Sequence, residues 1–350
     1  MKIVHCIFSF TVGGAETMLV DILDRQSLNH DVSLVVVNDI YDENLLATVS
    51  DRVRIIKLDR RSGSFPLVGM IRLNWLLRKM APDIIHVHDN KLLGLIRGLD
   101  EKIWFTVHDV GLAANYVRRG HHLIAISKAV MDDIIARGIT SGNMLRLINN
   151  GIRADEIVYR KAMPLSNEIK IVNVGRLNHN KKGQHILIEA VAELRRKGYN
   201  VTADFIGEGD SFQFLQELSC KLGVEDSINF LGNKSRDFIY AHLADYDLMC
   251  HSSIFEGFGL TVAEGMAAGL SVVVSTGDGP FEIIAQGKYG AYFENGNPQD
   301  CACVLRWVID NYPQALERAR LARQHVLEHY SIDSMVKEYI RYYNEQRYCR

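Results

Sequence analysis

Short runs of apolar residues alternate with helix-length segments along the whole chain, and this alternation limits the possible folds more than any other feature. The runs are almost continuously apolar, which is typical of strands in a parallel sheet that is buried on both faces. Strands that alternate with helices predict a doubly wound α/β architecture. The predicted strands are "KIVHCIFSF", "DVSLVVV", "VRIIKL", "DIIHVH", "KIWFTVH", "HLIAIS", "MLRLIN", "IKIVNVG", "VTADFIG", "SINFLG", "YDLMCHSS" and "LSVVVS".

The alternation stops at a polar segment that contains a proline, at about 151–168, and then starts again. This segment is the best candidate for a linker. We therefore predict two doubly wound, Rossmann-like domains, over residues 1–160 and 161–325, whose loops face a shared cleft. Residues 326–350 are predicted to form a C-terminal helix that crosses back and packs on the first domain.

The composition is typical of a soluble globular protein, with 47% hydrophobic and 23% charged residues among 350. A formal net charge of −2 gives no indication of a nucleic-acid partner. No apolar run approaches the roughly 18 residues of a membrane-spanning helix, and we expect no signal peptide. Six cysteines without C-x-x-C spacing favour reduced thiols and a cytoplasmic location.

Glycines and histidines follow the strands of the first domain. Gly13 and Gly14 come between the first strand and the first helix, where they either let a ligand approach the backbone or simply make a tight turn. "IIHVHDN" and "FTVHDVG" end two more strands and carry His86, His88 and His108. A His-x-His metal site is an alternative that we do not favour. For His108, an acid–base or hydrogen-bonding role is preferred to that of a core histidine.

Two cations stand before a helix in the second domain, in "VGRLNHNKKGQHILIEA". Positive charge at a helix N-terminus is unfavourable because of the helix dipole. Arg176 and Lys182 are therefore interpreted as ligands of an anion such as a phosphate, and a solvated charged loop is the alternative. Lys181 is an adjacent alternative to Lys182.

Two glutamates, Glu256 and Glu264, lie in the apolar stretch "HSSIFEGFGLTVAEGMAAGL". Carboxylates accept pairs of hydrogen bonds from neighbouring hydroxyls, so each glutamate suits a sugar diol. General acid–base chemistry by the pair is the rival interpretation. "FIGEGD" and "FLGNKS" end two other strands with Gly207 and Gly232, where backbone groups can approach a ligand closely.

Together and in this order, the motifs resemble those of the retaining glycosyltransferases of family 4, which have the GT-B fold. The resemblance covers essentially the whole chain. It rests on "GGAE" at 13–16, "DIIHVHD" at 83–89, "TVHD" at 106–109, "AISKAV" at 125–130, "NNGI" at 149–152, "VGRLNHNKKG" at 174–183, "FIGEGD", "FLG", "EGFGLTVAE" at 256–264 and "GDGPFEII" at 277–284.

The resemblance implies a catalytic set of Arg176, Lys182, Glu256 and His108. Arg176 and Lys182 would hold the donor diphosphate and stabilise the leaving group. Glu256 would bind the donor sugar, and His108 its far hydroxyl. One extra residue in the loop at 178–181 leaves the choice between Lys181 and Lys182 open.

The resemblance also implies a donor-binding set. Glu264 would bind the ribose hydroxyls, and Gly14 would lie close to the diphosphate and the acceptor. The amides of 258–260 would help Glu256 to hold the sugar. The donor-binding set comprises Gly14, Glu264, Phe258, Gly259, Leu260, Gly207, Gly232 and Asn233.

The resemblance further implies a reaction. A sugar would move with retention from a UDP- or GDP-linked donor to a glycan or a lipid-linked glycan, as in the biosynthesis of cell-surface polysaccharide. Neither a metal nor another cofactor is implied, and "DYD" at 245–247 is rejected as a metal motif because it begins a strand. A nucleotide-sugar epimerase with a GT-B-like fold is the alternative function.

A basic stretch between residues 52 and 79 holds eight lysines and arginines and one acidic residue, together with Phe65, Leu67, Met70 and Trp75. Basic side chains are attracted to an anionic membrane surface. We therefore predict weak peripheral membrane contact through residues near 57–72, on the inner face of the membrane. An ordinary helix that covers the sheet, with solvated arginines, is the alternative.

Overall fold

The computed structural model describes residues 1–61, 66–108, 110–111, 114–117, 121–139, 144–161 and 167–348. The chain divides into two compact units. The N-terminal unit comprises residues 1–151 together with 332–350, and the C-terminal unit comprises residues 152–331. The division falls within the predicted linker, before the predicted boundary at 160/161. Asp109 and Cys349 lie outside the described residues.

The N-terminal unit contains a seven-stranded parallel sheet with the strand order β3-β2-β1-β4-β5-β6-β7. The order changes direction between β1 and β4, which makes their carboxyl ends the place where such sheets bind ligands. The strands are β1 (Lys2–Ile7), β2 (Asp31–Asn38), β3 (Arg54–Arg60), β4 (Ile84–Val87), β5 (Ile103–Val107), β6 (His122–Ala125) and β7 (Leu145–Leu147).

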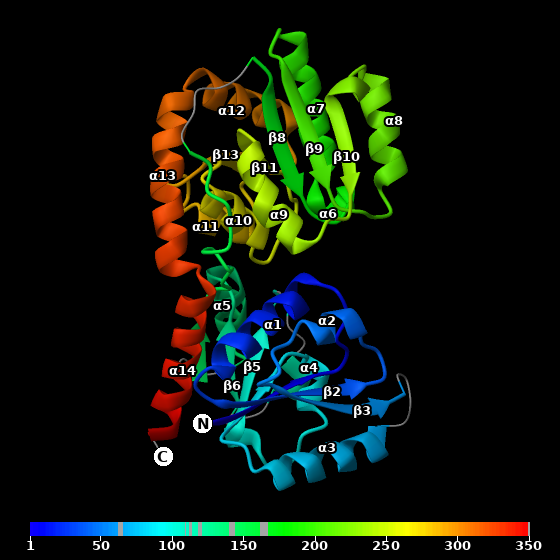
Figure 1. The fold of residues 1–350 in the computed structure, drawn as a ribbon, viewed down its shortest axis with the longest axis vertical. Coiled ribbons are helices and arrows are strands. Elements are labelled where there is room, and N and C mark those ends of the chain that lie inside the picture. Colours follow the sequence, from blue (N-terminus) through cyan, green and yellow to red (C-terminus); the bar gives the residue numbers. More distant parts are fainter. Residues whose placement is uncertain are drawn as a thin grey trace. The chain divides into compact units, whose positions relative to one another are not determined.

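Helices lie against this sheet (Figure 1), and its apolar side chains are buried. The described helices are α1 (Gly14–Ser27), α2 (Glu43–Ala47), α3 (Pro66–Met80), α4 (Asn90–Leu93) and α5 (Lys128–Ala136), with short 3₁₀ turns at 100–102 and 114–116. The last helix, α14 (Ile332–Tyr348), belongs to the same unit and packs beside α1. Tyr339 and Tyr343 of α14 are fully buried in the core of the unit. The predicted return of the C-terminal helix to the first domain is confirmed.

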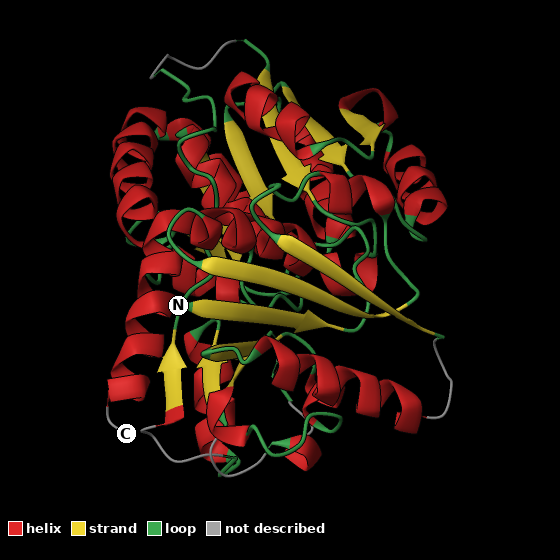
Figure 2. Ribbon diagram, turned by 60° about the horizontal axis from the view of Figure 1, so that its bottom comes forward, coloured by secondary structure: helices red, strands yellow, loops and turns green. Residues whose placement is uncertain are grey.

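The C-terminal unit contains a six-stranded parallel sheet with the order β10-β9-β8-β11-β12-β13. Its order changes direction between β8 and β11. In Figure 2 the strands of each sheet lie side by side with helices against their faces. The strands are β8 (Ile169–Val174), β9 (Val201–Ile206), β10 (Ile228–Gly232), β11 (Leu248–His251), β12 (Ser271–Ser275) and β13 (Ala291–Phe293).

The helices of the C-terminal unit follow the strands in the order that the sequence predicts. They bury a core of aliphatic residues around β8 and β9. These helices are α6 (His179–Lys182), α7 (Gln184–Arg196), α8 (Phe212–Leu222), α9 (Arg236–His242), α10 (Leu260–Ala268), α11 (Asp278–Ile283), α12 (Pro298–Asp310) and α13 (Tyr312–His329), with 3₁₀ turns at 225–227 and 243–245. None of the helices in the described part of the chain is long and apolar enough to cross a membrane.

All twelve predicted strands are present, and the α/β class with two doubly wound units is confirmed. β13 was not predicted, since only three residues of "GAYF" are extended. Asp247 of the rejected "DYD" motif lies just before β11 and is buried. It accepts hydrogen bonds from the side chain of Arg160, at 2.6 Å, and from the backbone of Lys170, at 2.8 Å. Asp247 therefore has a structural role here.

Candidate active site

The candidate site of the C-terminal unit lies at the carboxyl ends of β8 and β11, which are neighbours in the sheet. The loop after β8 carries Arg176 and leads into α6, which ends at Lys182. The loop after β11 carries Glu256 and leads into α10. The change of strand direction therefore brings together the loops that carry the predicted cations and glutamates.

Lys182 and Glu256 are in direct contact. The Lys182 ammonium donates a hydrogen bond to Glu256 Oε2, and the side chains are 23% and 20% exposed. His251, at the end of β11, is buried and places its Nε2 atom 3.6 Å from the same carboxylate oxygen. This distance is longer than a normal hydrogen bond, so His251 lies close to the carboxylate without bonding to it directly. A carboxylate that the sequence assigned to a sugar thus lies between a lysine and a histidine.

These neighbours decide the charge of Glu256. Burial alone would raise the pKa of the carboxyl group, but the contact with His251 and the positive charge of Lys182 outweigh burial and lower the pKa to about 2. Glu256 is therefore ionised at neutral pH. An ionised carboxylate accepts hydrogen bonds from hydroxyl groups and does not serve as a general acid.

The backbone fixes the contact between Lys182 and Glu256. The amides of Ile254 and Phe255 both donate to the carbonyl oxygen of Lys181, at 2.9 and 3.1 Å. Gly183, which caps the start of α7, has φ of +62°, and a Cβ atom there would collide with the carbonyl oxygen of Ser252. Only glycine fits this close approach of the two loops.

Arg176 and Lys181 are more exposed than Lys182. The Arg176 side chain is 73% exposed and lies 3.9 Å from Asp210, which is itself 90% exposed. Gln184 donates a hydrogen bond to the Arg176 carbonyl oxygen at 2.9 Å, which fixes the backbone but leaves the guanidinium group accessible. Lys181 is exposed, whereas Lys182 lies against Glu256. This arrangement favours Lys182 over Lys181 as the site lysine.

Glu264 lies in α10, whose N-terminus directly follows the loop of Glu256. Gly259 caps the helix with φ of +99°, a conformation that side chains other than glycine rarely adopt. The amides of Gly259 and Leu260 belong to the first turn, where a helix offers no internal acceptor. Phe258 is buried and packs edge-on against Tyr330. The first turn of α10 thus offers backbone donors beside Glu256.

The loops after β8, β9 and β10 line an open cavity of about 570 Å³. Gly207 donates to the carbonyl oxygen of Gly232 at 2.9 Å, and the Asn233 amide donates to Glu208 Oε1 at 3.3 Å. Gly207 has φ of +141°, and a Cβ atom there would collide with the Gly175 carbonyl. The cavity is lined by Leu177, Gly207, Glu208, Gly209, Phe212, Phe230, Leu231 and Gly232. Three of the predicted donor-binding residues, Gly207, Gly232 and Asn233, therefore lie in or beside one cavity.

Gly14 and His108 belong to the N-terminal unit. Gly14 is the first residue of α1, which is joined to the end of β1 by residues 8–13, and His108 directly follows β5. The ring of His108 lies 6.3 Å from the ring of His88, which follows β4. Both residues thus lie at the carboxyl edge of the sheet, as predicted.

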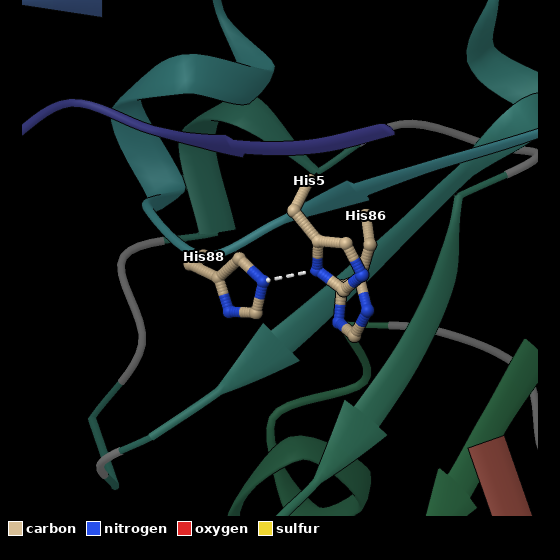
Figure 3. A group of neighbouring side chains, drawn as sticks. All are labelled: His5, His86 and His88. Carbon is tan, nitrogen blue, oxygen red and sulfur yellow. Dashed lines mark hydrogen bonds between the residues drawn. The ribbon is translucent and has the colours of Figure 1, made fainter. Parts of the chain in front are cut away.

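Three histidines of the N-terminal unit form a cluster, with one ligand atom from each of His5, His86 and His88 within 4.8 Å of the others (Figure 3). Both ring nitrogens of His5 and of His86, and Nε2 of His88, already have partners. His5 bonds to His88 at 3.0 Å and to Gln26 at 2.8 Å. His86 bonds to Thr106 at 2.7 Å and to Tyr343 of α14 at 2.6 Å.

Burial lowers the pKa of His5 to about 4, and it lowers the pKa of His86 and His88 well below the usual value. A metal at the His-x-His motif would have to displace Thr106 or Tyr343 from His86. The three histidines therefore form a neutral, hydrogen-bonded network that joins the sheet to α14.

Two residues of the site were missed from the sequence. His251 and Phe212 follow no motif that predicts their role. His251 is one of 13 histidines in the chain, and its contact with Glu256 depends on the path of the loop. Phe212 begins α8 and lines the cavity, although it is 44% exposed. One indication of a role for His251 was available from the sequence, which is that this polar residue stands at the carboxyl end of β11.

Two family models match the chain. The model described as "Glycosyltransferase Family 4" matches residues 12–156. The model described as "Glycosyl transferases group 1" matches residues 156–325. The two matches adjoin and together span nearly the entire chain.

Known proteins also resemble this chain. An uncharacterized glycosyltransferase of Methanocaldococcus jannaschii is 27% identical over 273 residues, which are 75% of this chain and 69% of that protein. The glycogen synthase of Mycobacterium tuberculosis is 28% identical over 284 residues, with 73% and 68% covered. The structure of HepE from Anabaena, in complex with UDP and glucose, is 22% identical, covers 97% of this chain and 98% of that one, and has a TM-score of 0.80.

Proposed function

Because the chain belongs to the family 4 glycosyltransferases, which have the GT-B fold, we propose that it transfers a sugar, with retention, from a nucleotide-sugar donor to a hydroxyl group of a glycan. The observation that carries this proposal is the contact between Lys182 and Glu256 at the carboxyl ends of β8 and β11. The cation that we propose for the phosphates and the ionised carboxylate that we propose for the sugar are in direct contact there.

Arg176 and Lys182 are proposed to bind the donor diphosphate. The exposed guanidinium of Arg176 is accessible to an incoming phosphate, and Lys182 can share its charge between Glu256 and the phosphate. Electrostatic stabilisation of the leaving diphosphate would supply the main part of catalysis. These cations would fill the role that a divalent metal has elsewhere, so the reaction is proposed to need neither a metal nor another cofactor.

Glu256 and the first turn of α10 are proposed to hold the transferred sugar. The carboxylate would accept hydrogen bonds from sugar hydroxyls, and the amides of Gly259 and Leu260 would donate to the sugar. Glu264 of the same helix is proposed to bind the ribose. In this mechanism the bond from the anomeric carbon to the diphosphate oxygen breaks, and the acceptor oxygen forms its bond to the anomeric carbon on the same face. The leaving phosphate takes the proton of the acceptor hydroxyl, and the anomeric configuration is retained.

The cavity between the loops of β8, β9 and β10 is proposed to receive the base of the nucleotide. Phe212 and Phe230 offer aromatic surface there, and backbone groups around Gly232 can bond to the base edge. UDP is the preferred nucleotide because HepE, which has a similar fold, was solved with UDP and glucose. GDP remains the alternative nucleotide.

The acceptor is proposed to be a glycan or a lipid-linked glycan, because a similar protein of M. tuberculosis is named glycogen synthase and glycogen is a glycan. Gly14 is proposed to lie close to the diphosphate and the acceptor, and His108 is proposed to contact the far hydroxyl of the donor sugar. The epimerase alternative is less favoured, because an ionised Glu256 with a pKa of about 2 is a weak base.

Thermal unfolding with a panel of nucleotides tests the donor proposal. A ligand that binds only the folded protein adds about 2.7 kcal/mol of stability at 100 times its dissociation constant. We expect UDP or GDP, and the matching nucleotide sugar, to raise Tm. Adenine and cytidine nucleotides should raise it less. An equal response to all bases would reject the base-binding cavity.

A further inference from the structure

Helix α3 is apolar on both of its faces. Leu73, Leu77 and Met80 are buried against the unit. Four large apolar side chains on the same helix are nevertheless exposed, with Val68 68%, Trp75 61%, Ile71 58% and Leu67 48% exposed. Large apolar side chains that are exposed together, rather than scattered singly, mark an interaction surface.

The exposed positions of α3 form one continuous arc. At about 100° per residue, the positions 67, 68, 71, 72, 75, 78 and 79 are neighbours around the helix. We call this arc the α3 outer face, and it consists of Leu67, Val68, Ile71, Arg72, Trp75, Arg78 and Lys79. Figure 1 shows α3 at the outside of the N-terminal unit, with β2 and β3 on its inner side.

Asn74 fixes the orientation of the helix. Its side chain donates to the carbonyl oxygens of Met70 and Leu95, both at 2.7 Å, and accepts from the Arg97 amide at 2.8 Å. Asn74 is buried, so rotation of α3 would break these hydrogen bonds inside the protein. The apolar side chains of the outer face cannot turn inward without this loss.

The charge of the outer face has one sign. It carries Arg72, Arg78 and Lys79, and α3 contains no acidic residue. The ammonium of Lys79 lies 4.9 Å above the ring of Trp75. Arg78 donates to the carbonyl oxygen of Arg97 at 2.9 Å. This hydrogen bond holds Arg97, which is also exposed, beside the end of the helix. An aromatic ring with a cation directly over it suits the boundary between lipid tails and headgroups.

The surface differs from the one that the sequence predicted at 57–72. Lys57 is engaged by Glu43 at 2.8 Å, and Arg60 donates to Asn38 at 2.9 Å. Residues 62–65 lie outside the described residues. The exposed apolar side chains are centred on Ile71 and Trp75 and continue to Lys79.

We propose that the α3 outer face docks on a bilayer surface that contains anionic lipids. The helix lies in the plane of the interface, its apolar side chains enter the boundary between headgroups and acyl chains, and its cations meet the lipid phosphates. This contact goes beyond the proposed sugar transfer, since it uses no residue of the candidate active site and requires no donor.

A second copy of the chain fits this surface less well. A two-fold contact would place the outer face against itself. Three cations would then meet three cations without an acidic residue of α3 to separate them, and like charges at such a contact are repulsive. An anionic lipid surface satisfies both the apolar side chains and the cations.

Co-sedimentation of the full chain with vesicles tests the proposal. We expect binding to phosphatidylcholine vesicles with 30% phosphatidylglycerol at low salt, and at least tenfold weaker partitioning into pure phosphatidylcholine or at 0.5 M salt. Ile71→Asn should weaken the partitioning at least tenfold. Ile135→Asn is the matched control because Ile135 is 52% exposed on α5 of the same unit, and it should bind as the wild type does.

Fluorescence locates the contact. The chain has three tryptophans, of which Trp104 is buried, so Trp307→Phe leaves Trp75 as the reporter. Its emission should shift to shorter wavelength with anionic vesicles, and lipids brominated near the headgroup should quench it. Absence of vesicle binding, or equal binding by wild type and Ile71→Asn, would overturn the proposal. A dimer in sedimentation that Ile71→Asn dissociates, without vesicle binding, would also overturn it and assign the face to a second copy.

Discussion

The ammonium group of Lys182 contacts the carboxylate of Glu256, although 74 positions separate the two residues in the sequence. The contact joins the loop after β8 to the loop after β11. Removing one partner of a mostly buried charge pair lowers the stability of a protein more than replacing both partners does. The reason is that the remaining charge is left buried without compensation. This asymmetry separates the structural role of the pair from its proposed role in catalysis.

Lys182→Met should lower turnover by about 10²–10³, the usual effect of losing one group that stabilises charge in the transition state. It should also lower the free energy of unfolding, because Glu256 remains ionised and partly buried. The double variant Lys182→Met with Glu256→Gln should recover stability and remain inactive. Turnover and chemical denaturation of the four proteins form a double-mutant cycle.

Arg176→Met is the matched control for stability. Arg176 is 73% exposed, so its loss should reduce turnover to a similar extent and leave the unfolding free energy nearly unchanged. If Lys182→Met and Arg176→Met both turned over at near-normal rates, neither cation would bind the diphosphate.

The two glutamates should respond differently. Glu256→Gln keeps the shape of the side chain but removes the negative charge, so it should lower turnover more than the affinity for the bare nucleoside diphosphate. Glu264→Ala should chiefly weaken that affinity, since its proposed partner is the ribose. Calorimetric titration with UDP and GDP measures both. Equal losses of nucleotide affinity in the two variants would cancel this division of roles.

Phe212→Ala should weaken nucleotide binding about tenfold or more, since stacking of one base on an aromatic side chain contributes about 1–3 kcal/mol. Phe214→Ala is its control. Phe214 is 43% exposed on the same helix, but it stacks on His179 and does not line the cavity. Inorganic pyrophosphate should bind both variants equally. A base outside this cavity would leave UDP affinity unchanged in Phe212→Ala.

The histidine network predicts a loss of stability in mild acid. The pKa of His5 is lowered to about 4 in the folded chain, against about 6.5 when unfolded. The unfolded chain therefore takes up a proton first as pH falls below 6.5, and the folded chain loses about 2 kcal/mol of stability from His5 alone by pH 5. Below a pH of about 4 this loss levels off. His86 and His88 shift in the same direction.

Denaturant unfolding at pH 7 and pH 5 checks this prediction. Trp307→Phe confines the tryptophan signal to the N-terminal unit, where Trp104 stacks on His122. In the same background, His5→Gln should make the dependence on pH shallower. An identical pH dependence with and without His5 would show that another group causes the loss.

The arrangement of strands was predictable because buried parallel strands have a simple pattern. Runs such as "KIVHCIF" and "DIIHVH" have no other place than the interior of a sheet. The order of the loops was predictable for the same reason, since glycines and charges that follow such runs must lie at the carboxyl edge. Both sheets, and the return of α14, agree with these expectations.

Side-chain partners were less predictable. The sequence assigned Lys182 to a phosphate and Glu256 to a sugar, and it gave no indication that they bind each other, because contact between distant loops depends on backbone path. The collision that a Cβ atom at Gly183 would make with Ser252 shows how closely these loops pass. His251 was missed for this reason too.

The exposed side of α3 had a sequence signal that was only partly used. Apolar residues surround the helix on all sides in "PLVGMIRLNWLLRKM", which is unusual for a surface helix. The number of basic residues indicated the right region of the sequence, but it did not indicate which face of α3 is exposed. The face depends on which side packs on the sheet, and Asn74 decides that through its hydrogen bonds to Met70 and Leu95.

Release of nucleoside diphosphate from a panel of UDP- and GDP-sugars, in the presence of a glycan acceptor and EDTA, tests the central claim most directly. We expect one donor to release its nucleoside diphosphate without added metal, with a product that retains the anomeric configuration, and Arg176→Met to abolish most of the release. No release from any donor, release only after magnesium or manganese is restored, or an inverted product would contradict the account.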